Sequence, residues 1–98
     1  MTLEDISKIE ILENGEMYVV LASGGKPSYQ LIYREAAEVY WDDERKGFKA
    51  PTPRTWCHSE WFHHIVKVAR NCDIELSLTE QTTWVNVPQD TKVNICAK

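Results

Sequence analysis

Residues 6–22 read ISKIEILENGEMYVVLA, in which two β-rich runs flank Asn14 and Gly15. An Asn-Gly pair tolerates both positive-φ positions of a type I′ turn, so this stretch predicts a β-hairpin with a two-residue loop. The prediction is specific, because the length of the loop also fixes which residues of the two strands lie opposite each other.

A two-residue loop places Ile11 opposite Tyr18 and Ile9 opposite Val20, so these four side chains share one face of the hairpin. The other face carries, beside Lys8 and Glu10, the apolar side chains of Leu12, Met17, Val19 and Leu21. A solvated sheet face rarely carries so much apolar surface, which indicates that something covers part of this second face.

The next segment, YQLIYREAAEVYW at 29–41, places its apolar side chains on one broad helical stripe. Ser28 is a suitable N-cap, so a helix from Tyr29 to Trp41 is the first expectation. Two strands are the alternative, because YQLIY alternates and VYWDDERKGF could form a hairpin around a turn at 42–47.

Two prolines then fix the backbone of an extended connector at 48–54. The segment that follows, TWCHSEWFHHIVKVARN, predicts a helix from about Glu60 to Asn71, capped by Thr55 or Ser59. Its core stripe contains Trp61, Ile65, Val68, Ala69 and Cys72.

The C-terminal part predicts a second hairpin, because residues 74–78 alternate and a β-rich run at 82–87 follows a polar link. In that hairpin Trp84 points away from the aliphatic side. The tail after Pro88 is either a short strand or a helix that begins at Asp90. The elements predict one two-layer α+β domain over 1–98, with an antiparallel sheet built from the N-terminal and C-terminal hairpins and one or two helices packed on one face.

Length and charge exclude several classes of protein. The 98 residues suffice for one hydrophobic core, and 11 Lys and Arg against 15 Asp and Glu give a formal net charge of −4. This balance disfavours nucleic acid as a partner, and the acidic residues 42–44 cancel much of the field of the basic run at 45–54.

No signal peptide and no run of about 18 apolar residues occurs, so neither export nor a membrane is expected. The cysteine spacing favours reduced thiols in a cytoplasmic protein.

Cysteine and histidine chemistry is the first catalytic possibility. Cys57 near a helix start, with His58, His63 or His64 as a base, would suit nucleophilic catalysis. Glu60 and His64 could form the edge of a metal site. The simpler explanations are that Cys57 is a small residue in a turn and that Glu60 and His64 form an exposed pair on a helix. The sequence therefore predicts no catalytic residue, no metal and no cofactor, and favours a protein that is not an enzyme.

Aromatic side chains are the most unusual feature of the composition, with four Trp, four Tyr and two Phe. Trp61 is assigned to the core, whereas Trp41, Trp56 and Trp84 have no assigned place. Together with the second face of the hairpin, they exceed the hydrophobic surface that a small two-layer domain readily covers.

The segments PTPRTWCHSEWFHHIV (51–66) and LSLTEQTTWVNVP (76–88) resemble the small orphan proteins carried on bacterial integron gene cassettes. The resemblance implies a compact α+β accessory protein of a bacterium, of a kind that is often oligomeric. It assigns no site residue.

Two functions would account for the surplus aromatic and aliphatic surface. The first is a non-catalytic interaction module, a homodimer whose interface is an apolar sheet face formed by Met17, Val19, Leu21 and Trp84. The second is a small-molecule-binding protein, because tryptophan faces attract cations and flat rings. Its pocket for a cationic or aromatic ligand would be lined by Tyr40, Trp41 and Trp56, with acid from Asp42 or Asp43.

Overall fold

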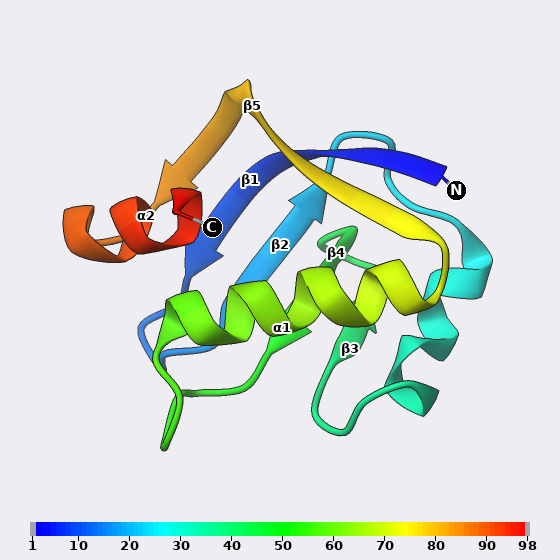
Figure 1. The fold of residues 1–98 in the computed structure, drawn as a ribbon, viewed down its shortest axis with the longest axis horizontal. Helices are drawn as coiled ribbons and strands as arrows, with labels where there is room; N and C mark the ends of the chain where they lie inside the picture. Colours follow the sequence, from blue (N-terminus) through cyan, green and yellow to red (C-terminus); the bar gives the residue numbers. More distant parts are fainter. Residues whose placement is uncertain (1, 98) are drawn as a thin grey trace.

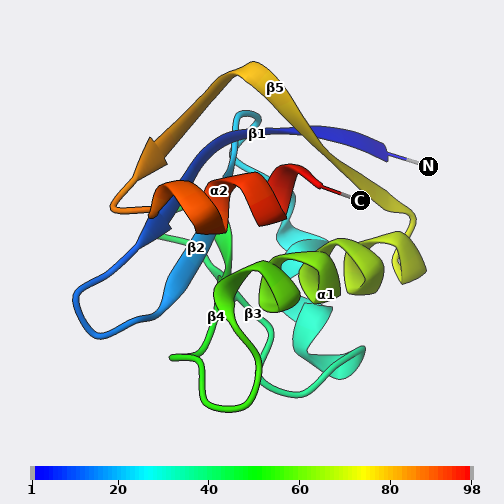
Figure 2. The same cartoon turned by 60° about the vertical axis from the view of Figure 1, so that its left-hand side comes forward.

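The computed structural model describes residues 2–97 (Figure 1). Its elements, in chain order, are β1 (Thr2–Ile11), β2 (Met17–Leu21), the 3-10 helix η1 (Pro27–Arg34), β3 (Tyr40–Asp42), β4 (Gly47–Ala50), α1 (His58–Asn71), β5 (Ile74–Val85) and α2 (Gln89–Cys96). Within these residues the strands form one sheet in the order β3-β4-β2-β1-β5. Helices α1 and α2 lie on the same face of that sheet (Figures 1 and 2). The predicted α+β class and the helices on one face are confirmed.

The hairpin of β1 and β2 is present, but its loop has three residues, 13–15, and not two. The Gly15 N–H donates to the Leu12 carbonyl (2.9 Å), and the Leu12 N–H donates to the Glu16 carbonyl (2.8 Å). Gly15 has a φ of +94°, whereas Asn14 keeps a negative φ. This is a type I turn followed by a glycine in the left-handed region, the usual three-residue hairpin loop, so the type I′ turn was wrong.

The extra loop residue shifts the strand pairing by one position. Ile9 lies opposite Val19, and Ile11 lies opposite Met17. Met17 and Val19 are therefore fully buried on the core side, and Leu21 is 3% exposed. The predicted register was wrong, and the three hairpin residues proposed for a dimer interface belong to the core of the single chain.

Charged side chains close the other face of the sheet. Arg45 Nη1 lies 3.1 Å from Glu10 Oε1, and Lys49 Nζ lies 2.9 Å from Glu16 Oε2. The Arg45 guanidinium also covers the ring of Tyr18 at 4.6 Å, which leaves Tyr18 only 5% exposed. The outer face of the hairpin therefore presents ion pairs, and Met17, Val19 and Leu21, which motivated the homodimer, do not lie on it.

The segment 29–41 does not form one helix. A 3-10 helix ends at Arg34, and β3 follows, paired antiparallel with β4 around the 42–47 turn. Of the alternative with two strands, the hairpin around the 42–47 turn is thus confirmed, whereas YQLIY forms no strand.

The Tyr29 hydroxyl donates to the buried carboxylate of Glu4, which also accepts from Ser23 Oγ (2.6 Å). This network holds η1 against β1, and burial raises the pKa of the Tyr29 hydroxyl.

The predicted helix at 60–71 is confirmed as α1. It begins at His58, with Cys57 as its N-cap in place of Thr55 or Ser59. The Glu60 carboxylate accepts the Cys57 N–H (3.1 Å), which satisfies one of the free donors at the helix start. Its buried apolar side chains are those of Phe62, Ile65, Val68 and Ala69. Trp61, assigned to the core from the sequence, is only partly buried at the edge of this stripe.

The second predicted hairpin is wrong, because residues 74–85 form the single strand β5. β5 runs parallel to β1, after α1 has crossed the sheet face, so the sheet is mixed. The predicted polar turn is a register shift within the strand, where Thr82 Oγ1 donates to the Ile6 carbonyl (2.6 Å) and accepts the Thr79 N–H (3.0 Å). The tail forms the helix α2.

Trp84 lies opposite Ile9 in this pairing and is partly buried against the core. The Lys92 ammonium of α2 lies 5.2 Å from the centre of its ring. Trp84 therefore packs on the same side as the aliphatic core, and not away from it as predicted.

The observed register makes opposite predictions for two neighbouring valines of β2. Val19→Thr places a hydroxyl in the dry core and is expected to lower the free energy of unfolding by about 1–3 kcal/mol. The matched Val20→Thr, on the outer face, is expected to change it by less than about 0.5 kcal/mol. Urea unfolding followed by tryptophan fluorescence measures both, and a larger loss for Val20→Thr would contradict the register.

Candidate ligand-binding site

The connector between β4 and α1 is anchored to the hairpin loop at both ends. Near its start, Thr52 Oγ1 donates to the Asn14 carbonyl (2.7 Å). At its end, His58 Nε2 donates to the Gly15 carbonyl (2.8 Å). Thr52 also packs so closely on Gly15 that a Cβ there would lie 2.9 Å from Thr52 Cγ2. The turn at 13–15 thus positions the residues between 52 and 58.

A cavity of about 430 Å³ lies beside this connector, between the loop that precedes β3 and the first turns of α1. Its lining includes Glu38, Arg54, Trp56, Trp61 and His64. Residues from three separate parts of the chain therefore meet at one hollow.

Three rings form the aromatic wall of the cavity. The ring centre of Trp56 lies 4.9 Å from that of Trp61 and 5.0 Å from that of His64, both in edge-to-face arrangements. Trp61 and His64 lie 5.7 Å apart. Trp56 is 40% exposed, so part of its ring remains open to a ligand.

The imidazole in this wall favours its neutral form. Burial lowers the pKa of His64 below its usual value, and the positive charge of Lys67 lowers it further. At neutral pH the wall is therefore an uncharged aromatic surface.

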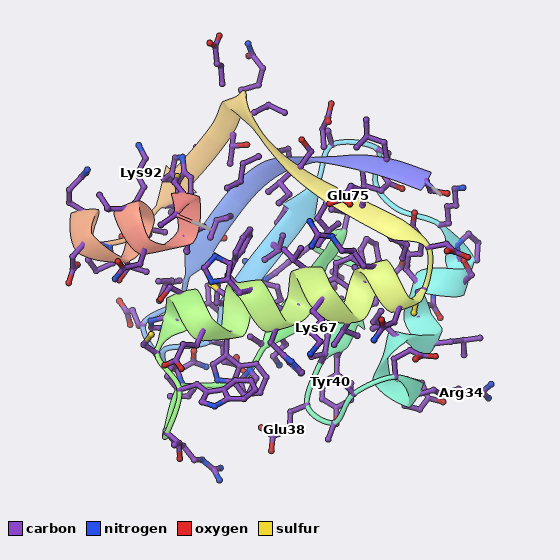
Figure 3. All side chains as sticks on the ribbon, in the orientation of Figure 1. Arg34, Glu38, Tyr40, Lys67, Glu75 and Lys92 are labelled. Carbon is purple, nitrogen blue, oxygen red and sulfur yellow. The ribbon has the colours of Figure 1, made fainter. Side chains whose placement is uncertain are left out.

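Polar groups lie at the rim of the cavity. Arg54 and Glu38 also line a smaller hollow of about 190 Å³ together with Tyr40 and Lys49, so the two hollows adjoin. Figure 3 shows Glu38 and Tyr40 close together at the start of β3. Among residues 2–97 neither Arg54 nor Glu38 forms an ion pair, whereas Lys49 pairs with Glu16, which raises the pKa of Lys49.

Glu38 adopts a φ of +71°, an uncommon conformation for a residue other than glycine. Strained backbone of this kind is frequent at binding sites, where the surrounding structure imposes it. Here the strain occurs in the short loop that brings the Glu38 side chain to both hollows.

The structure separates the five residues predicted for the ligand site. Trp56 and the half-exposed Tyr40 line the adjoining hollows. Trp41 instead turns inward, with its ring 5.5 Å from Tyr29 and 5.0 Å from Phe48. It packs on the core and lines neither hollow.

The two aspartates serve the turn between β3 and β4. Asp42 Oδ1 accepts the N–H groups of Glu44 and Arg45. Asp43 pairs with Lys46 at 3.1 Å, and this contact lowers the pKa of Asp43. Neither aspartate lines the aromatic cavity.

Sequence reasoning missed the contribution of Trp61, His64, Arg54 and Glu38. A signal was present for the first two, because residues three apart on a helix lie on the same face. The approach of Trp56 to that face depends on the anchored connector, which no local pattern reveals.

Each of the three histidines, considered as a base for the Cys57 thiol, contacts another group. His58 bonds the hairpin loop, His63 contacts the Ala97 carbonyl (3.0 Å), and His64 belongs to the aromatic wall. The Glu60 carboxylate caps α1. Across residues 2–97, no three His, Cys, Asp or Glu side chains gather as a metal site would require.

Over the same residues, no helix has the length and hydropathy needed to cross a membrane.

A comparison with models of protein families identifies the class to which this chain belongs. The chain is an integron cassette protein. It belongs to the family described as Integron Cassette Protein Hfx_Cass5, whose family model matches residues 4–82. The resemblance noted in the segments at 51–66 and 76–88 is thereby confirmed.

One solved structure is described as "Structure from the mobile metagenome of North West Arm Sewage Outfall: Integron Cassette Protein Hfx_Cass5". It is 33% identical to this chain, with 97% of this chain and 93% of that chain covered and a TM-score of 0.46. A comparison with the curated proteins finds no match.

The lowered pKa of His64 predicts a pH dependence of stability. In the unfolded chain the imidazole titrates near ~6.5, but in the folded protein it takes up its proton at a lower pH. The folded state then binds fewer protons, so its free energy of unfolding falls as the pH drops below about 6.5.

Trp56→Ala uncovers the imidazole ring of His64. Because burial lowers the pKa of His64, this change is expected to raise that pKa towards its ordinary value. Titration of the His64 ring signals by NMR measures the change. Trp84→Ala, beneath α2, is the matched control and should leave the titration of His64 in place. An unaltered His64 pKa in Trp56→Ala would show that Trp56 does not bury the ring.

Proposed function

We propose that this protein binds a small aromatic ligand in the cavity beside the connector. The observation that carries the proposal is the wall of Trp56, Trp61 and His64 next to an arginine that has no ion-pair partner within residues 2–97. Ligand sites usually combine such an apolar surface with a few polar groups that fix orientation.

The size of the cavity limits the ligand. Its volume of about 430 Å³ lies at the lower end of the range of roughly 300–1,000 Å³ typical of small-molecule sites. A compound of one or two rings fits this space. The partly exposed ring of Trp56 offers its face or edge for an offset aromatic contact, worth about 0.5–1.5 kcal/mol beyond the buried area.

Charge favours an aromatic ligand with a negative group over a cation. A cation would gain from the tryptophan rings, but it would meet the charge of Arg54, against a single carboxylate, Glu38, at the rim. The positive charge of Lys67 lies outside the lining but close enough to lower the pKa of His64, so it also disfavours a cation. An aromatic carboxylate would place its ring on Trp56 and its charge by the guanidinium of Arg54, which suits a planar carboxylate.

A panel that contains benzoate, indole-3-carboxylate, uncharged indole, benzamidine and tetramethylammonium tests the proposal by quenching of tryptophan fluorescence and by calorimetry. The two carboxylates are expected to bind more tightly than the two cations. Trp56→Ala should weaken binding of the carboxylates at least about tenfold, because it removes the stacking surface. Arg54→Gln should weaken the carboxylates while it leaves uncharged indole unaffected.

Trp84→Ala is the matched control, since it removes an indole far along the chain that packs under α2 and lines neither hollow. Equal losses in Trp84→Ala and Trp56→Ala would contradict the site. Tighter binding of tetramethylammonium than of benzoate would overturn the class of ligand, and no saturable binding by the panel would overturn the function.

A further inference from the structure

The strand β5 leaves one of its edges open. It lies at the end of the sheet and pairs only with β1. Alternate residues of an edge strand turn their N–H and C=O groups away from the neighbouring strand. Among residues 2–97, no other strand or loop makes backbone hydrogen bonds to that edge.

A groove of about 650 Å³ runs along this edge, between β5, α1 and the end of α2. Four consecutive residues of β5, 75–78, line it. Because successive residues of a strand point to opposite faces, a hollow that touches all four lies against the edge of the strand and not against one face.

Helix α1 supplies the opposite wall of the groove. His63, Val66, Lys67 and Arg70 have the spacing of one helical face. Figure 3 labels Lys67 on α1 and Glu75 on β5, the two elements that bound the groove. The groove is thus an open strand edge that faces a helix.

The floor of the groove is apolar. It is lined by the buried side chains of Phe62, Leu76 and Ile95 and by the partly buried Val66 and Leu78. These positions offer places for apolar side chains that point inward from a ligand lying along the edge.

The rim is more basic than acidic. Arg70 Nη2 is paired with Glu75 Oε2 at 3.1 Å, whereas Lys67 has no ion-pair partner within residues 2–97. The unpaired ammonium favours an acidic group on the ligand.

The sequence of β5 does not protect this edge. IELSLTEQTTWV contains no lysine and no proline, the residues that commonly block pairing at edges. The register shift bends the strand only beyond Leu78, so residues 74–78 stay regular. The opposite edge strand, β3, has only three residues and is followed by a charged turn.

We propose that an extended peptide with at least one acidic residue adds to β5 as a further strand in this groove. Its backbone hydrogen-bonds to the open edge at 75–78, and alternate apolar side chains enter the floor between β5 and α1. The acidic side chain pairs with Lys67. Strand addition of this kind gains affinity from the main chain and specificity from the alternate side chains.

Selection from a library of random peptides about nine residues long, displayed on phage, tests the proposal with the intact protein. The enriched peptides are expected to alternate apolar and polar residues, to contain Asp or Glu, and to bind with Kd values of about 1–100 μM. Their addition should shift the NMR amide signals of residues 75–78 and slow hydrogen exchange at alternate positions there.

Chemical and sequence variants separate strand addition from adsorption on the apolar floor. N-methylation of every second peptide amide should abolish binding when those amides face β5, and should leave binding unchanged when they face away from it. Lys67→Glu should weaken the acidic peptides at least about fivefold, whereas Arg34→Glu, the same reversal of charge placed on η1, should not.

Several results would overturn the proposal. These are a selection without enrichment of alternating peptides, amide shifts confined to other elements, and equal tolerance of N-methylation in both phases. Protection of residues 75–78 that rises with protein concentration in the absence of peptide would identify a second copy of the chain as the occupant, and would overturn the peptide.

Discussion

The backbone of Gly15, held at a φ of +94°, is the constraint on which the rest of the structure depends. It closes the hairpin with three loop residues and so selects which side chains of β1 and β2 enter the core. The same turn accepts hydrogen bonds from Thr52 and His58, which fix both ends of the connector that carries Arg54 and Trp56. One local conformation therefore connects the core to the candidate site.

The register also distributes charge over the molecule. With Val19 in the core, the outer sheet face carries the ion pairs of Glu10 and Glu16 with Arg45 and Lys49. Exposed pairs of this kind add little stability, but they make the face a poor site for a hydrophobic partner. The surfaces that could bind something lie instead around α1, with the aromatic cavity on one flank and the groove along β5 on the other.

Local signals predicted the elements with strong periodicity, namely the hairpin and α1. They failed where long-range contacts determine the conformation of the chain. Asn-Gly is compatible with two loop lengths, and packing against Thr52 is the contact that accompanies the longer one. The link at 79–81 has the composition of a turn, yet Thr82 bonds Ile6, which is 76 positions away.

At the candidate site Trp56 was predicted, but its partners Trp61 and His64 depend on tertiary packing. Trp41 was misplaced because its strand pairs it with Phe48.

A NOESY spectrum of the protein tests the central role of this turn most directly. Leu12 bonds Glu16, so Ile9 and Val19 form a closely approaching antiparallel pair, with Cα atoms about 4.5 Å apart. A strong cross-peak is expected between the α-protons of Ile9 and Val19, together with contacts between the Thr52 methyl group and Gly15. A strong α-proton cross-peak that joins Val19 to Glu10 in place of Ile9, which a two-residue loop would produce, or the absence of the Thr52 contact, would contradict this role of the turn.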